Sequence, residues 1–271
     1  MRTFIRLIID ATTQSWGSYA LTGERPTHTF PTRSGVVGLV GNALGLDRLD
    51  VEALDSLHRS LRVSSRVLRK GTFLTDYHKK DFCDPGGSSL WDNVSPMTTR
   101  GKEKTAREFL RDRRGTFIEP LEYDGNPKLS NRQYLNGWAF EVVLEVLPDS
   151  LIPAPKILEA LKNPVRALYF GRKTCLPLRP LVEEDSEVIE AESPMDVFAI
   201  PSPPPWQTEP ERPWYPLGDP SKELHAHMDE APEGDFQVLP QDIYDNCHSV
   251  NGRIFHPRRV YHVTRNLETS K

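Results

Sequence analysis

Three stretches of the sequence carry residues whose types and spacing suit the binding of phosphate groups. The first is Thr32, Arg33 and Ser34, which stand directly before an apolar run laced with glycines. At a helix start, free backbone N–H groups and the positive end of the helix dipole favour an anion. The run has no GK[ST] sequence, so it is not a Walker A loop. Ordinary helix capping is the alternative interpretation of these three residues.

The second stretch is residues 100–114, RGKEKTAREFLRDRR, with seven basic and three acidic side chains. Arginine and lysine at this density suit contacts to a phosphate backbone. The alternative is a solvated helix with local ion pairs, such as Glu103 with Arg107. The candidate phosphate ligands in this stretch are Arg107, Arg111, Arg113 and Arg114.

The third stretch is the basic loop of Gly171, Arg172 and Lys173. A glycine there lets the backbone approach a ligand closely, although a plain turn fits the sequence equally well.

Three aromatic residues are candidates for stacking on a nucleic-acid base. They are Trp16, Tyr77 and His78, and exposed rings of this kind form the platforms of RNA-binding proteins. Each has the alternative of packing in the core. For Trp16 the core is the favoured interpretation, because it follows a predicted first strand.

The sequence predicts no metal site, no cofactor and no disulfide framework. The three cysteines, Cys83, Cys175 and Cys247, are far apart and form no CxxC pair. His225 and His227 lack a third ligand in a recognisable spacing, which also argues against a zinc hydrolase. No apolar run approaches the ~20 residues of a membrane span, and the first residues do not resemble a signal peptide. We therefore expect a cytoplasmic protein with reduced thiols and no membrane partner.

The charge of the 271-residue chain is unevenly distributed, although the net value is only -4. Residues 183–245 carry a net charge of -15, residues 246–271 carry +4, and residues 1–182 carry +7. A polyanion would be attracted to the first part and the tail, and repelled by the middle. The alternative is that the acidic segment only keeps the protein in solution.

The hydrophobic pattern predicts the α+β class with a ferredoxin-like body. The expected order is strand, helix, helix, strand, long insertion, strand, helix, strand, at residues 2–9, 35–46, 50–60, 62–68, 74–136, 138–147, 153–164 and 166–170. Ser34 is the expected N-cap of the first helix. Its glycines at 35, 38, 41 and 45 are expected to allow close packing, since each interior glycine otherwise costs up to ~1 kcal/mol. The sheet of such a fold is also the RNA platform of the RRM.

We expect two parts in the chain. Residues 1–182 form the body, including the insertion at about 74–136. Residues 183–271 form an irregular, mostly β C-terminal elaboration, rich in proline and acidic residues, that ends in a basic strand. Eleven of the 24 prolines lie in residues 183–245, and the tail RIFHPRRVYHV alternates as a strand does.

Several motifs together resemble one family of CRISPR-associated proteins. QSWG is followed by GERPTHTFPTRSGVVGLVGNALGL, then by LTDYH, RQYLNGWAFEVVLEV, LYFGRKTCLPLRPL and the tail RIFHPRRVYHV. Their order and content are similar to those of the CasD-type RAMP subunit of type I-E Cascade, the family-five proteins. The resemblance spans most of residues 4–182 and fades over 183–250.

The resemblance implies a function in antiviral defence. Family members have a ferredoxin-like (RRM/RAMP) body with a thumb, here residues 74–136, and cap the 5′ handle of the crRNA at one end of Cascade. The implied partners are the crRNA, the backbone subunit and the large subunit of the complex, with target DNA reached indirectly. The resemblance favours RNA, or a neighbouring subunit, as the ligand of the basic stretch 100–114, and RNA phosphate as the ligand of Arg172 and Lys173.

Three functions are considered for a protein of this kind. Relatives of type I-C cut precursor crRNA without a metal, and Tyr77, His78, Lys79 and Lys80 could form such a site on one loop. The GRKTCLPL stretch is more similar to the type I-E pattern, which implies a non-catalytic RNA-binding subunit. A general RRM-like RNA chaperone would share the sheet but would need no thumb.

Overall fold

The computed structural model describes residues 1–18, 24–47, 49–80, 128–200, 223–234, 236–249 and 254–266. The chain divides into two compact units: one of Met1–Leu21, Arg25–Asp76 and Gln133–Lys271, the other of Thr22–Glu24 and Tyr77–Arg132. Most of the second unit lies outside the described residues, as do the candidates Arg107, Arg111, Arg113 and Arg114.

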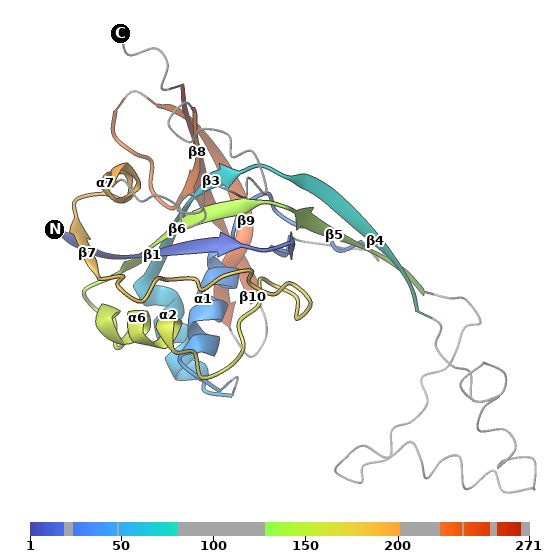
Figure 1. Cartoon of the computed structure of the whole chain (residues 1–271), viewed down its shortest axis with the longest axis horizontal. Coiled ribbons are helices and arrows are strands. Elements are labelled where there is room, and N and C mark those ends of the chain that lie inside the picture. Colours follow the sequence, from blue (N-terminus) through green and yellow to red (C-terminus); the bar gives the residue numbers. More distant parts are fainter. Residues whose placement is uncertain are drawn as a thin grey trace, which may run out of the picture. The chain divides into compact units, whose positions relative to one another are not determined.

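The first unit is built on a seven-stranded antiparallel sheet with the strand order β7-β1-β6-β3-β8-β10-β9 (Figure 1). The strands are β1 (Arg2–Asp10), β3 (Leu61–Arg69), β6 (Ala139–Val146), β7 (Ile189–Ala191), β8 (Glu223–Met228), β9 (Gln237–Ser249) and β10 (Ile254–Asn266). A second sheet has the order β2-β5-β4, formed by β2 (Thr13–Gln14), β5 (Lys128–Asn136) and β4 (Thr72–Lys80).

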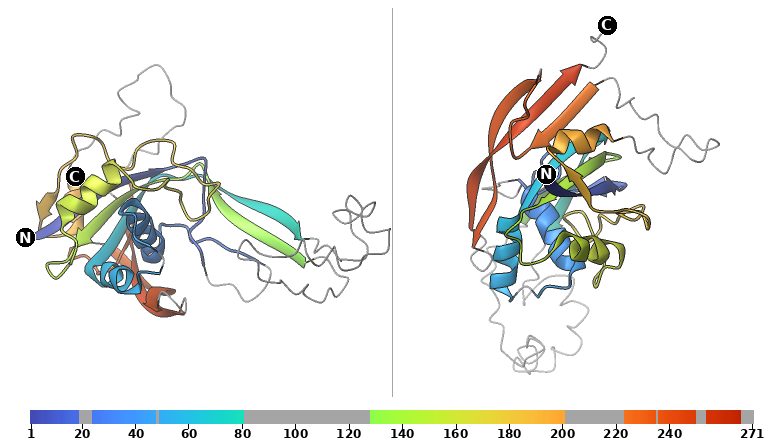
Figure 2. Two further views of the ribbon diagram at one scale, coloured as in Figure 1. Left: turned by 90° about the horizontal axis from the view of Figure 1, so that it is seen from below. Right: turned by 90° about the vertical axis from the view of Figure 1, so that its left-hand side faces the viewer.

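Three helices pack on one face of the large sheet (Figures 1 and 2). They are α1 (Arg33–Ala43), α2 (Val51–Ser60) and α6 (Ala154–Lys162). Because side chains alternate along a strand, Ile5, Leu7 and Ile9 of β1 face these helices and are fully buried. The short helix α7 (Pro194–Ala199) lies against Phe4 and Val143, on the opposite face. No helix among the described residues is long and apolar enough to cross a membrane.

The predicted elements of the body are largely confirmed. Strands at 2–9, 62–68 and 138–147, and the helix at 50–60, differ from the observed elements by a residue or two. Asp50 caps α2 by accepting a hydrogen bond from Ala53 N at 3.2 Å. The helix that opens at Pro153 ends at Lys162, directly before Asn163.

Two element predictions were wrong. No strand forms at 166–170, because the backbone groups of Phe170 bond outside any strand ladder: its N–H donates to the Cys175 carbonyl, and its carbonyl accepts from the N–H of Ser15, far away in the sequence. The strand that pairs with the outer edge of β1 is β7, which lies after residue 182. The irregular structure predicted for 183–245 is also wrong for its residues 223–228, because β8 pairs directly with β3 and extends the main sheet.

The glycines in α1 and at its C-terminal end are explained by different structural features. A Cβ on Gly35 would lie 2.9 Å from the Trp16 ring, and one on Gly41 would lie 3.3 Å from Leu54 of α2. Gly45 ends the helix with a φ of +74°, where Leu46 N–H donates back to Gly41 O at 3.0 Å. A Cβ on Gly38, however, would meet nothing within 4 Å. Close packing therefore explains Gly35 and Gly41, and the expectation for Gly38 was wrong.

Candidate nucleic-acid interface

The start of α1 does not offer an open anion site, because the protein fills it with its own carboxylate. The N-cap is Thr32 rather than Ser34; its side chain is buried and makes no capping hydrogen bond. Instead the backbone N–H of Arg33 donates to Asp245 Oδ2 of β9 at 2.8 Å. The anion at this helix start is therefore the Asp245 carboxylate of the protein itself, not the predicted phosphate.

The side chain of Arg33 belongs to the packing between α1, α2 and the C-terminal strands. Its Nη2 donates to the His58 carbonyl, and its buried Nε has no hydrogen-bond partner. Burial lowers the pKa of Arg33, partly offset by Asp229. The sequence interpretation of Arg33 as a phosphate ligand is therefore contradicted by its surroundings.

Asp245 is the centre of a buried ion network. It is 2% exposed and accepts two hydrogen bonds from Arg258 of β10, from Nε at 2.8 Å and from Nη2 at 2.7 Å. Arg258 also pairs with Asp229, which in turn accepts from the backbone N–H of Val63 in β3 at 3.1 Å. Burial raises the pKa of Asp229, although Arg258 opposes this. The network joins β9 and β10 to α1 and β3, and no local sequence pattern predicted it.

Charged side chains, rather than an RRM-type aromatic platform, line the described part of the large sheet on one face. On the face opposite α1, Glu141 and Glu145 of β6 are paired with arginines of the two neighbouring strands. These pairs are Arg2–Glu145 and Arg66–Glu141, with Arg6 3.6 Å from Glu141. Over its described residues this face is an Arg–Glu ladder covered in part by α7, so the RRM interpretation of the sheet is not supported.

Trp16 lies in the core and is not available for stacking on a base. It is 1% exposed, its Nε1 donates to Gln14 Oε1 at 3.0 Å, and its ring lies 6.0 Å from that of Phe170. Its backbone N–H donates to Thr27 Oγ1 at 2.7 Å. The buried tryptophan thus holds three sequence-distant segments together.

The stacking candidates Tyr77 and His78 lie in strand β4, whereas the catalytic hypothesis placed them on a loop. Tyr77 is 61% exposed. The described positions of β4 around it are exposed as well, which leaves its ring open to a ligand.

The loop at Gly171–Lys173 is the predicted site that the fold presents most directly. Gly171 has a φ of +88°, and a Cβ there would lie 1.7 Å from the Ser15 carbonyl oxygen, so the position requires glycine. Cys175 N–H donates to the Arg172 carbonyl at 2.8 Å and closes a turn. Lys173 and Thr174 are exposed at its tip.

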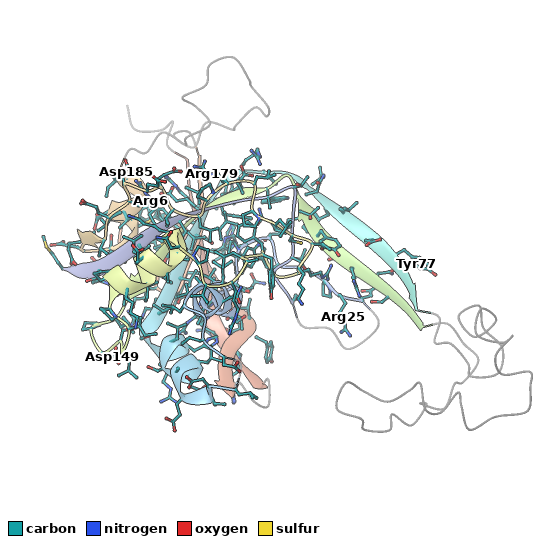
Figure 3. All side chains as sticks on the ribbon, turned by 60° about the horizontal axis from the view of Figure 1, so that its bottom comes forward. Arg6, Arg25, Tyr77, Asp149, Arg179 and Asp185 are labelled. Carbon is teal, nitrogen blue, oxygen red and sulfur yellow. The ribbon has the colours of Figure 1, made fainter. Side chains whose placement is uncertain are left out.

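Arg172 is fixed by the segments on either side of it. Its guanidinium carbon lies 4.3 Å from the centroid of the Tyr134 ring. Its Nη1 donates to the Gln133 carbonyl and its Nη2 to the Arg25 carbonyl, each at 3.3 Å. Arg25 itself is exposed (Figure 3), and sequence reasoning missed it because it stands alone in RPTH without a basic neighbour.

Three motifs of the sequence therefore meet at one place. QSWG contributes the supporting carbonyl of Ser15, RQYLNGW contributes Gln133 and Tyr134, and FGRKTC contributes the basic loop. The resulting surface carries three basic residues, Arg25, Arg172 and Lys173, on closely packed backbone. Such an arrangement suits an anionic polymer, because Arg and Lys neutralise phosphates.

His225 and His227 of β8 lie close to a third histidine, His262, which the sequence did not predict. His262 of β10 is the pairing partner of His227, and its Nδ1 lies 2.8 Å from His227 Nε2. Burial, and then the neighbouring histidines, lower the pKa of His227 to about 3. Among the described residues no group of three or more His, Cys, Asp or Glu could hold a metal ion.

Residues 4–238 match the family model of the CRISPR-associated protein (Cas_Cas5). The chain belongs to the Cas5 family. Among curated relatives, the CRISPR system Cascade subunit CasD of Escherichia coli (strain K12) is 29% identical over 182 residues, covering 67% of this chain and 70% of that protein.

Two solved structures share the fold of this Cas5-family chain. One is described as "Crystal structure of Cas protein", with a TM-score of 0.59, 25% identity, and coverage of 98% of this chain and 96% of that chain. The other is a "CRISPR RNA-guided surveillance complex", with a TM-score of 0.57, 22% identity, and coverage of 97% and 88%. Because these alignments cover nearly the whole chain, the structural similarity continues past residue 182, where the sequence resemblance fades.

Proposed function

We propose that this protein is a subunit of a type I CRISPR surveillance complex, in which it binds and caps the 5′ handle of the crRNA. Family membership, the CasD relative and the convergence of three motifs at the Gly171–Lys173 loop support this proposal. The convergence is the observation that carries it, because motifs far apart in sequence build one exposed basic surface.

The proposed RNA ligands in the described residues are Arg25 and Lys173, with Arg172 between them. The basic stretch 100–114 remains a proposed contact to RNA or to the neighbouring backbone subunit. Together these surfaces would anchor the crRNA and its neighbours for RNA-guided recognition of target DNA.

The strand order supports the proposed ferredoxin-like body. Within the large sheet, β7-β1-β6-β3 is the fourth, first, third and second strand of a βαββαβ unit, and every neighbouring pair is antiparallel. The assignment of residues 74–136 to a thumb rests on the family resemblance and remains part of this proposal.

We further propose that the protein is not a nuclease. Purified protein should leave repeat RNA uncut without added metal, and His78→Ala should leave crRNA maturation unchanged in cells. Cleavage by the isolated wild type that is lost in this variant would instead establish the type I-C-like endoribonuclease.

The central test is the affinity for single-stranded RNA of the repeat-derived handle sequence, measured over a salt series. Lys173→Ala should weaken binding and reduce the log–log salt slope by ~0.7, the value for one lost phosphate contact on a single strand. Lys156→Ala is the matched control, because Lys156 is an exposed lysine on helix α6 rather than on the loop. Equal behaviour of the two variants would contradict the proposed site.

The second test is purification of the native assembly. We expect a stoichiometric complex of several subunits that contains a short RNA. A monomer that carries no RNA, from cells that express the whole gene cluster, would contradict the proposal.

A further inference from the structure

The hydrogen bonds of Arg172 differ from those expected of a typical phosphate ligand. Both of its terminal nitrogens already donate to backbone carbonyls, those of Gln133 and Arg25. A bidentate phosphate clamp uses two parallel N–H groups of the same fork. Two of the five donors of Arg172 are thus committed to the protein, and they fix the orientation of the guanidinium plane.

The surroundings of Arg172 leave it partly open to solvent. Beneath it the Tyr134 ring is 8% exposed and lies within cation–π distance. Arg172 itself is only half-buried, between the exposed residues Gly171 and Lys173. The ring therefore supports the guanidinium group, and part of Arg172 stays accessible beside the exposed residues Gly171 and Lys173.

We infer that Arg172 is a stacking platform for an unpaired base of the RNA, rather than a phosphate ligand. Guanidinium planes stack on bases in single-stranded RNA recognition. The Tyr134 ring, the Arg172 plane and the base would form three successive layers. Because the two carbonyls fix the plane before RNA arrives, little side-chain freedom is lost on binding. This inference rests on the proposed RNA-binding function and specifies what one residue of that site recognises.

A charge-conserving substitution separates stacking from phosphate contact. Arg172→Lys keeps the positive charge but loses the plane, so it should weaken RNA binding about as much as Arg172→Ala does. The expected loss is about 5- to 150-fold, the range for one stacked base. The salt slope should stay that of the wild type in both variants, whereas Lys173→Ala should reduce it by ~0.7. Circular dichroism melting checks that each variant is folded.

A fluorescent base gives an independent measurement. The handle RNA is synthesised with 2-aminopurine at each position in turn, and the fluorescence is recorded on adding the full-length chain. One position should be quenched by the wild type and by Lys173→Ala at saturation, but not by Arg172→Lys.

Each outcome decides a different claim. If Arg172→Lys binds as tightly as the wild type while Arg172→Ala loses ~0.7 in slope, the residue contacts phosphate and the stacking inference is wrong. The proposed function stands in that case. If the wild-type chain binds no handle RNA, alone or in its native complex, the proposed function fails and the inference fails with it.

Discussion

Replacing Asp245 by alanine tests whether the buried ion network holds the C-terminal strands on the body. The substitution removes three hydrogen bonds: two from Arg258 and one from the backbone N–H of Arg33. Breaking a buried pair by removing one partner costs about 3–5 kcal/mol, because the other charge stays buried. Arg258 keeps Asp229 as a counter-ion, so we expect the lower end, about 3 kcal/mol. For a chain of this size, that lowers Tm by roughly 6–12 °C.

The same two strands provide a matched control. Asp242 of β9 pairs with Arg259 of β10, but the two side chains are 54% and 59% exposed. Exposed pairs contribute little to stability, since water screens the charges. Asp242→Ala should therefore leave Tm within experimental error in thermal melts followed by circular dichroism. If Asp245→Ala lowers Tm no further than Asp242→Ala does, the network does not hold these strands in place.

Three shorter predictions concern single positions. Gly38→Ala should stabilise α1 by about 0.5–1 kcal/mol, whereas Gly35→Ala should destabilise it through the Trp16 ring; chemical denaturation measures both. Gly171→Ala should lower stability by at least about 2 kcal/mol in the same assay, because it forces a side chain into a left-handed conformation against backbone. Burial lowers the pKa of His227 to about 3. The unfolded chain therefore takes up this proton first as pH falls below about 6.5, and this histidine should contribute a loss of stability of about 1.4 kcal/mol per pH unit from pH 6 to 4. His227→Gln should reduce that slope, and an unchanged slope would contradict the assignment.

The parts of the fold that the sequence predicted are those set by local patterns. The continuous apolar run of β6 is buried at every position, and the amphipathic helix α2 begins at a residue that caps it. β7 was not predicted, because three residues in an acidic stretch are too few to show a hydrophobic periodicity. It is a strand because it pairs with β1. Long-range pairing of this kind has no signature in the sequence of either segment.

The candidate site likewise has features that the sequence predicted and features that it did not. The glycine requirement at Gly171 and the basic turn were predictable, because a tight loop followed by Arg172 and Lys173 is a local feature. That Arg172 lies on Tyr134 was not, since the two are brought together by β5 and by the core position of Trp16. Asp245 binds the start of α1 although it lies 212 residues after Arg33. Local sequence patterns could not predict this contact either.

The uneven charge of the chain also has a different meaning in the fold. The acidic segment 183–245 was expected to repel a polyanion because it carries a net charge of -15. Several of its carboxylates are instead paired with arginines of the body and the tail: Asp229 and Asp245 with Arg258, Glu230 with Arg2 and Arg62, and Asp242 with Arg259. Charges neutralised by close partners contribute little to the field at a distance. This segment would therefore oppose the proposed binding of RNA at the Gly171–Lys173 surface less than its composition implies, and Asp229 and Asp245 hold the guanidinium of Arg258 within the protein.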